Sequence, residues 1–147
     1  MMKQACPSEE PIRSSLRLTY LQLCTRGVVP SFQFPAHILE AFSARSISIR
    51  IVAATGSNLS LAVEASEEEL RAVCNELSTV ADITIETDVA ALSIPLSSSA
   101  EACSLARKLK DIPLLILTYH EGQAHVVVKL SDYAQAAAPI APASENL

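Results

Sequence analysis

The sequence predicts an α+β fold of two related βαββαβ modules, the second incomplete, with antiparallel sheets and helices on one face. Two observations carry this prediction. Ala36–Val63 and Glu101–Val128, offset by 65 residues, share one order: a helical pattern, a short break, a β-branched run, a glycine-containing turn and a second β-branched run. Their apolar positions also correspond, since Leu61 matches Val126. Self-similarity at a fixed spacing indicates that one small unit has been duplicated.

The composition limits the functions that the chain can have. Its 147 residues fit one ordinary domain or two very small ones. Half of the residues are apolar but only 4% are aromatic, so the core must be built from Leu, Ile, Val and Ala. A net charge of −5 and a pI near 5.1 argue against a nucleic-acid partner, because phosphates select clustered Lys and Arg.

The chain shows no targeting or membrane signal. No apolar run reaches the roughly 18 residues that span a bilayer, and the N-terminus has no hydrophobic signal segment. We therefore expect a cytoplasmic protein without a membrane partner. The four cysteines are expected to be reduced there. They form no CxxC or Cys/His ligand spacing, so we expect no metal site.

The first module follows a flexible leader, residues 1–14, that contains few large apolar residues. Leu16–Cys24 alternates apolar and polar residues, which predicts a strand. A loop with Gly27 and Pro30 comes next, and Pro35 suits the first turn of a helix, where a missing N–H costs little. The apolar face of that helix holds Ile38, Leu39 and Phe42.

Ile47–Ala54 and Asn58–Glu64 are expected to pair as a hairpin in one of two registers. A three-residue loop, Thr55–Ser57, keeps Arg50 off the core. A two-residue loop at 56–57 places Arg50 among the apolar residues, so we favour the first register. The facing pairs are then Ile49 with Val63, Ile51 with Leu61 and Ala53 with Leu59.

The next helix begins at a capping box, in which Ser66 and Glu69 satisfy each other's backbone N–H groups. Its buried stripe follows the spacing i, i+3, i+4, i+7 and consists of Leu70, Val73, Cys74 and Leu77. A strand at Ala81–Thr87 completes the order strand, helix, strand, strand, helix, strand, which is the ferredoxin-like plan. The first module is expected to span residues 15–88.

The second module starts at once with a strand over Val89–Ile94. A capping box at Ser98–Glu101 opens its helix, whose apolar stripe is Ala102, Leu105, Ala106 and Leu109. A hairpin over Ile112–Lys129 turns near Glu121 and Gly122. The module, residues 89–130, then lacks its last strand, which must come from elsewhere. Residues 131–147 are expected to form a short helix and a disordered tail.

Both faces of the second hairpin are apolar. One face is expected to hold Leu114, Ile116, Val126 and Val128, and the other Leu115, Leu117, Tyr119 and Val127. A sheet covered on one side only does not need this pattern. We infer that the second face meets a partner, either the other repeat or another subunit.

The residues give no support for catalysis. Only three glycines occur, which excludes the glycine-rich loops that bind nucleotides, and we expect no cofactor and no catalytic residue. His120 and His125 flank the second hairpin turn, but Glu121 is the one further metal ligand at an obvious spacing. An enzyme that uses Cys24 or a histidine is the least favoured alternative.

The site that the residues themselves indicate is a loop-to-helix junction, residues 25–36, beside the start of the first hairpin. Backbone N–H groups at a helix N-terminus attract a carboxylate. The junction therefore predicts binding of a small anionic or zwitterionic ligand.

The segment Phe34–Glu64 resembles the first regulatory ACT domain of aspartokinases. The family positions that fall in register without gaps are Phe34, Ile38, Phe42, Ile47, Ile49, Ile51, Ser60, Leu61 and Val63. The resemblance continues into Val89–Ile94 and covers roughly residues 16–129. It implies paired ACT domains that bind an amino-acid effector, commonly lysine or threonine, and a homodimer. The family's kinase module, with its Lys-x-Gly-Gly motif, has no counterpart here, so the chain resembles the regulatory region alone.

The resemblance also gives the candidate ligand-binding residues: Gln33, Phe34, Pro35, Ala36, Arg50, Ile51, Thr55 and Gly56. Several of these depart from the family's pattern. Gln33 replaces a glycine, Pro35 removes an amide donor, and Gly56 replaces a glutamate. Arg50 stands where the family has the acid that meets the effector's amino group, so we expect an acidic or non-amino ligand rather than lysine.

Two non-catalytic functions follow from these observations. The first is a regulatory protein that binds an amino-acid-like or acidic metabolite at a domain or subunit interface. The second is a degenerate module that acts by dimerisation or by docking onto a separate partner enzyme.

Overall fold

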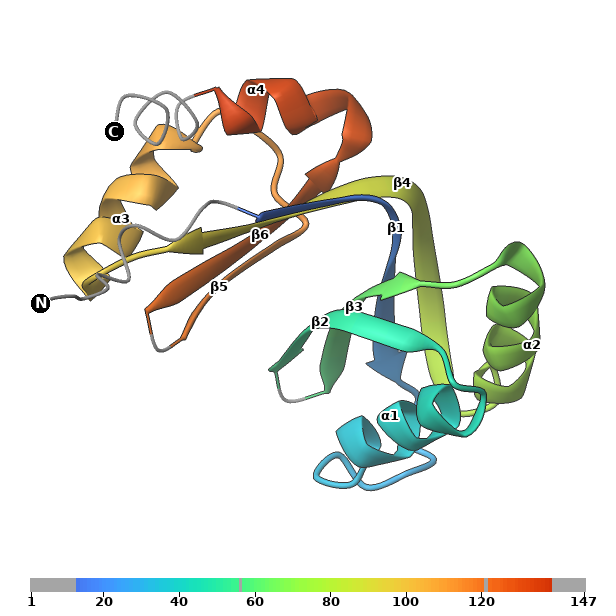
Figure 1. Cartoon of the computed structure of the whole chain (residues 1–147). Coiled ribbons are helices and arrows are strands. Elements are labelled where there is room, and N and C mark those ends of the chain that lie inside the picture. The colour runs from blue at the N-terminus through green and yellow to red at the C-terminus, as the bar shows by residue number, and fades with distance from the viewer. Residues whose placement is uncertain (1–12, 56, 121, 139–147) are drawn as a thin grey trace, which may run out of the picture. The chain divides into compact units, whose positions relative to one another are not determined.

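The computed structural model describes residues 13–55, 57–120 and 122–138. Within them the chain forms an α+β fold with a six-stranded antiparallel sheet of order β2-β3-β1-β4-β6-β5 (Figure 1). The strands are β1 (Arg13–Thr25), β2 (Ser48–Thr55), β3 (Asn58–Glu64), β4 (Ala81–Pro95), β5 (Ile116–His120) and β6 (Gln123–Lys129). The helices are α1 (Phe34–Ala44), α2 (Glu67–Leu77), α3 (Ser99–Lys108) and α4 (Tyr133–Ala137), with a 3-10 turn at Leu130–Asp132. The expected tail and most of the expected leader lie outside the described residues.

The chain divides into two compact units. The first unit is Arg17–Thr87, and the second unit combines the described residues up to Leu16 with those from Asp88 onward. The strands β1 and β4 each contribute to both units. Each of them has one non-glycine residue with a positive φ at its unit boundary, 63° at Arg17 and 56° at Asp88.

The two strands expected over Ala81–Thr87 and Val89–Ile94 are one continuous strand, β4. The left-handed conformation of Asp88 explains why the pattern of apolar residues predicted two separate strands. Before it, Ala81 packs in the core of the first unit, and after it, Leu92 packs in the core of the second. The core-facing positions thus change from odd to even numbers, because one residue leaves the regular alternation.

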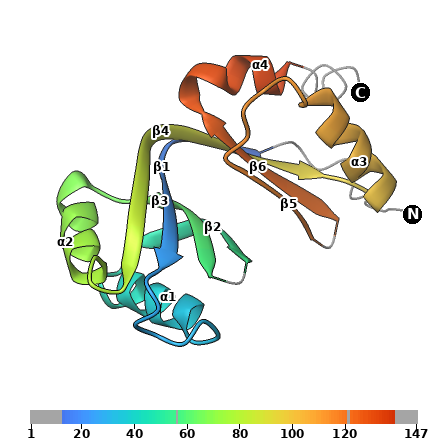
Figure 2. The same ribbon diagram turned by 180° about the vertical axis from the view of Figure 1, so that it is seen from behind.

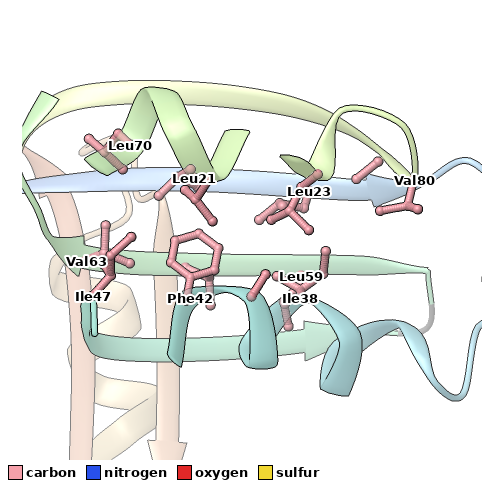
Figure 3. Close-up of a cluster of buried hydrophobic side chains, with 14 of the residues drawn as sticks. Leu21, Leu23, Ile38, Phe42, Ile47, Leu59, Val63, Leu70 and Val80 are labelled. Carbon is pink, nitrogen blue, oxygen red and sulfur yellow. The ribbon is translucent and has the colours of Figure 1, made fainter. Parts of the chain in front are cut away.

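The core of the first unit lies between one face of its sheet and the helices α1 and α2 (Figure 3). Phe42 and Ile38 of α1 reach this core as expected, and Figure 3 shows Ile38 beside Leu59. The sheet contributes Leu21, Leu23, Leu59, Leu61 and Val63, and α2 contributes Leu70, Val73 and Leu77. The core is aliphatic apart from the two phenylalanines Phe34 and Phe42, as the composition predicts.

Two helix ends of the first unit have defined caps, of which the first was predicted. The predicted capping box of α2 is present: the Glu69 N–H donates to Ser66 Oγ (3.2 Å) and the Ser66 N–H to the Glu69 carboxylate (2.9 Å). The helix α1 ends in a Schellman-type turn, in which the N–H groups of Ser46 and Ile47 donate to the carbonyls of Ser43 (2.9 Å) and Phe42 (3.1 Å).

The second unit repeats this arrangement (Figure 2). Leu105 and Leu109 at α3 pack on Val126 and Val128 of β6 and on Leu92 and Ile94 of β4. The offset of 65 residues holds in the structure, because β3 and β6 have matching bounds and α1 and α3 begin at matching residues. Segment Arg13–Leu16 of β1 belongs to this unit, and Ser14 Oγ lies 2.8 Å from the Tyr133 hydroxyl of α4.

The first hairpin differs from the register that we favoured. Ile49 pairs with Val63 as expected, but Thr55 pairs with Asn58, so the loop has two residues. A β-bulge at Arg50 explains how the Ile49–Val63 pair and the two-residue loop can both be present. Arg50 is an extra residue of β2 without a partner in β3, so it stays apart from the apolar residues of the core.

The face assignment of the second hairpin was wrong. Ile116 pairs with Val127, and Leu117 pairs with Val126, because the two-residue turn fixes the register. Leu117 therefore shares the helix side of the sheet with Val126 and is 41% exposed. Ile116 and Val127, on the other face, are buried within the chain itself.

None of the helices among the described residues is both long and apolar enough to cross a bilayer.

Candidate functional site

The N-terminus of α1 carries four of the predicted ligand-binding residues, and they differ in role. Gln33 is the N-cap residue, is exposed, and makes no side-chain hydrogen bond to the helix. Phe34 is completely buried and packs in the core cluster of the first unit. Pro35 lies in the first turn, as predicted, and Ala36 is exposed.

This helix end offers few free backbone donors. The Phe34 N–H donates to the Ser31 carbonyl (3.4 Å), and Pro35 has no N–H. The His37 N–H already bonds to the Gln33 carbonyl (3.0 Å). Within the described part of the chain, Ala36 is thus the first-turn residue whose N–H has no backbone acceptor. A helix start with several free N–H groups binds an anion more firmly than a start with one.

Arg50 has a partner in its own hairpin. Its guanidinium donates two hydrogen bonds to one carboxylate oxygen of Glu64, from Nη2 at 2.6 Å and from Nε at 3.2 Å. Both side chains are about half exposed, 50% and 58%, so water screens the pair and its contribution to stability is small. The charge of Arg50 is locally neutralised, and a ligand carboxylate must compete with Glu64 for it.

The structure separates the predicted site residues into two groups. Thr55 is the last residue of β2, the strand that follows α1 and runs in the opposite direction (Figure 3). Arg50 and Ile51 lie about five residues back along β2, roughly 15 Å away at the rise of a strand. Ile51 is also buried, at 7% exposure. Gly56 lies outside the described residues.

A polar pair that the sequence reasoning missed lies in the second unit. Ser93 Oγ is 2.9 Å from His125 Nδ1, between the neighbouring strands β4 and β6. Partial burial lowers the pKa of His125, because a charged imidazolium is poorly solvated there. The two residues are 32 positions apart, and only the strand register brings them together. Their core-facing neighbours Leu92 and Ile94 on β4 and Val126 on β6 show that Ser93 and His125 lie on the sheet face away from the helix core.

The described residues contain no group of three or more His, Cys, Asp or Glu side chains placed to hold a metal ion. Cys24 and Cys74 are partly buried and Cys103 is exposed, all three as free thiols. Burial raises the pKa of the Cys74 thiol, which makes it less reactive as a nucleophile.

Comparison with known proteins rests on structure, since no family model and no curated protein matches the sequence. A structure described as a C-terminal regulatory domain of aspartate kinase from Porphyromonas gingivalis W83 superposes with a TM-score of 0.78. The match covers 86% of this chain and 90% of that one, at 20% identity. The chain has the fold of an aspartokinase regulatory region.

Two further structures show the same aspartokinase regulatory fold. The ligand-free regulatory subunit of aspartate kinase from Thermus thermophilus has a TM-score of 0.67 and 15% identity, and the match covers 85% of this chain and 91% of the subunit. Aspartokinase III of Escherichia coli, in complex with aspartate and ADP, has a TM-score of 0.73 and 16% identity. The match covers 85% of this chain but only 31% of that enzyme, so it involves a part of the kinase polypeptide.

Proposed function

We propose that this protein is a non-catalytic regulator of the ACT type, made of two ferredoxin-like modules. The observation that carries the proposal is the fold match over 86% of the chain and 90% of a regulatory domain. In this proposal Arg13–Leu16 of β1, which clusters with the second unit, supplies the strand that we expected this module to take from elsewhere.

The proposed effector is a small acidic or amino-acid-like metabolite, bound at a domain or subunit interface of a homodimer. Escherichia coli aspartokinase III, which shares the fold, has been solved with lysine and aspartate. In this chain Arg50 carries the positive charge that would favour a carboxylate ligand, and Thr55 and the Ala36 N–H supply polar contacts at the other end of β2. The proposal includes Gln33 and Gly56 as neighbours of those contacts.

Isothermal titration and thermal unfolding with a panel of amino acids and dicarboxylic acids test this proposal. We expect one acidic compound to raise the melting temperature and to release heat on binding. The Arg50→Ala variant should lose this response. Arg71→Ala is the matched control, because Arg71 is also an exposed arginine paired with a glutamate, at 3.4 Å, and lies on α2. No response to any compound, or an equal loss in both variants, contradicts effector binding through Arg50.

The second candidate is a docking module without an effector. The ion pair between Arg50 and Glu64 and the shortage of free N–H groups at the start of α1 favour it, because both features leave less for a ligand to bind. Sedimentation at micromolar concentration separates the two: a homodimer that binds no member of the panel supports this candidate.

A further inference from the structure

The outer edge of β4 in the first unit is an open strand edge. The sheet order places β1 on one side of β4 and β6 on the other. β6 pairs with β4 only over Val89–Pro95. Within the described part of the chain, the opposite side of Asp82–Thr87 therefore has no strand partner. Residues Asp82, Thr84 and Thr87 are exposed, and Ile85 is 45% exposed.

The hydrogen-bond pattern identifies which backbone groups face this edge. The Arg26 N–H donates to the Val80 carbonyl (3.0 Å), and the Thr25 N–H to the Ser57 carbonyl on the other side of β1 (2.9 Å). In an antiparallel ladder successive residues point their N–H and C=O groups to opposite sides. Even-numbered residues of β4 therefore face β1, and the N–H and C=O groups of Ile83, Ile85 and Thr87 face the open edge.

The two outermost strands of the sheet, β2 and β5, are interrupted or short, whereas the Asp82–Thr87 edge of β4 is neither. A bulge at Arg50 interrupts β2, and β5 is only 5 residues long. The open part of β4 is rich in β-branched residues and contains no proline or glycine. Asp82, Thr84 and Glu86 alternate on the face of this strand that points away from the helices, since Ala81 and Ile83 pack toward the core.

The charge of the first unit favours a basic occupant. Arg17–Thr87 contains five arginines and eight carboxylates, a net charge of −3. Four of the arginines form ion pairs, which involve Asp82, Glu76, Glu64 and Glu67. Glu86, beside the open edge, has no ion pair among the described residues. A second copy of β4 is disfavoured, because antiparallel pairing centred on Thr84 would place Asp82 opposite Glu86 twice.

We propose that the β4 edge Asp82–Thr87 is a docking site for an extended segment of a partner protein that carries Lys or Arg at alternate positions. The segment adds a strand to the sheet: its backbone bonds to Ile83, Ile85 and Thr87, and its cations face Glu86 and Asp82. The proposal goes beyond the proposed function and does not rest on it, since it involves neither the α1 N-terminus nor Arg50.

The test uses the full chain and a nine-residue peptide of alternating Lys and Val, with blocked ends. Amide exchange followed by NMR is the main readout. We expect the peptide to slow exchange at Ile83, Ile85 and Thr87 by about tenfold or more, and to leave Thr84 and Glu86, which bond to β1, unchanged. No binding at millimolar peptide, or protection without this alternation, overturns the proposal.

Matched controls separate strand addition from simple charge attraction. The same peptide with alternate N-methyl groups keeps its charge but cannot pair, and it should not bind; binding overturns the proposal. Ile85→Pro removes an outward N–H and leaves the β1 ladder intact, so it should fold and lose binding. Glu86→Lys should weaken binding about fivefold or more, whereas Glu68→Lys, the same charge change on exposed α2, should change it by less than about twofold. If amide exchange at Ile83, Ile85 and Thr87 slows as the protein concentration rises without any peptide, the occupant of the edge is a second copy of the chain and the proposal is overturned.

Discussion

Ser46 has φ 56°, a left-handed conformation that a serine adopts at a cost. It is the residue after the C-cap of α1, where the Schellman-type turn requires this conformation and where glycine is the usual choice. The backbone of Ser46 thus fixes the exit of α1 toward β2, while its side chain is exposed.

We predict that Ser46→Gly stabilises the protein by about 0.5–1 kcal/mol, because glycine has no Cβ to strain a positive φ. Urea unfolding measures the change. Ser43→Gly, inside the last turn of α1, is the control and should destabilise by about 0.5 kcal/mol. A loss of stability in Ser46→Gly would contradict the assigned turn.

His125 is predicted to make stability depend on pH. Its pKa is lowered in the folded state by partial burial, whereas the unfolded chain has an ordinary histidine pKa of about 6.5. Above that pH both states are neutral and the folded state keeps its full stability. As the pH falls below about 6.5, the unfolded state binds the proton more readily, so the free energy of unfolding decreases until the folded pKa is passed.

Substitution His125→Gln should flatten this decrease, since glutamine can still bond to Ser93 and does not titrate. The measurement is the free energy of unfolding at intervals from pH 8 to about 5. An unaltered slope in His125→Gln would show that other groups cause it.

At the scale of elements, the first hairpin shows how one residue decides a register. Ile49 and Arg50 together oppose Val63, and the ladder is regular on either side. Arg50 is therefore the inserted residue of a bulge, and its guanidinium satisfies Glu64 outside the core. Ile49, the residue before the bulge, lies on the same face as Val63 and packs against the core cluster of the first unit.

Deleting Arg50 should be tolerated, because the ladder then runs without interruption from Ile49 with Val63 to Ile51 with Ala62. We expect a change in stability within about 1 kcal/mol, the size of an exposed ion pair. Deletion of Ala53 is the control: it shifts the strand by one residue and should unfold the first unit. Circular dichroism and urea unfolding distinguish the outcomes, and unfolding on deletion of Arg50 would refute the bulge assignment.

At the scale of the whole molecule, the chain has two separate hydrophobic clusters, one in each compact unit. Phe42 is a large buried member of the first, and Leu109 of the second. Both strands that are shared between the units, β1 and β4, carry a left-handed residue at the boundary. Each unit should therefore respond first to damage in its own cluster.

Two variants test this independence. Phe42→Ala should destabilise the first unit by about 3–5 kcal/mol, and Leu109→Ala the second by about 2–5 kcal/mol. Native-state amide exchange, read residue by residue, should show the loss in β3 for the first variant and in β6 for the second. Equal loss in both strands from either variant would mean that the chain unfolds as one unit.

Local sequence patterns predicted the helices, the repeated helix-and-hairpin order and the capping box of α2. Local rules sufficed for them: the spacing of Leu70, Val73 and Leu77 predicted the buried face of α2, Ser66 and Glu69 predicted its cap, and the offset of 65 residues predicted the repeated helix and hairpin. These features depend on neighbours within a few residues, so the order of residues fixes them.

The pairings between distant segments became visible only in the folded chain. The tertiary structure inserted the bulge at Arg50, joined two predicted strands into β4, and assigned Arg13–Leu16 to the second unit. It also brought Ser93 to His125 and Arg50 to Glu64. A strand register balances a whole row of side chains on two faces against one local irregularity, and no single stretch of sequence contains both sides of that balance.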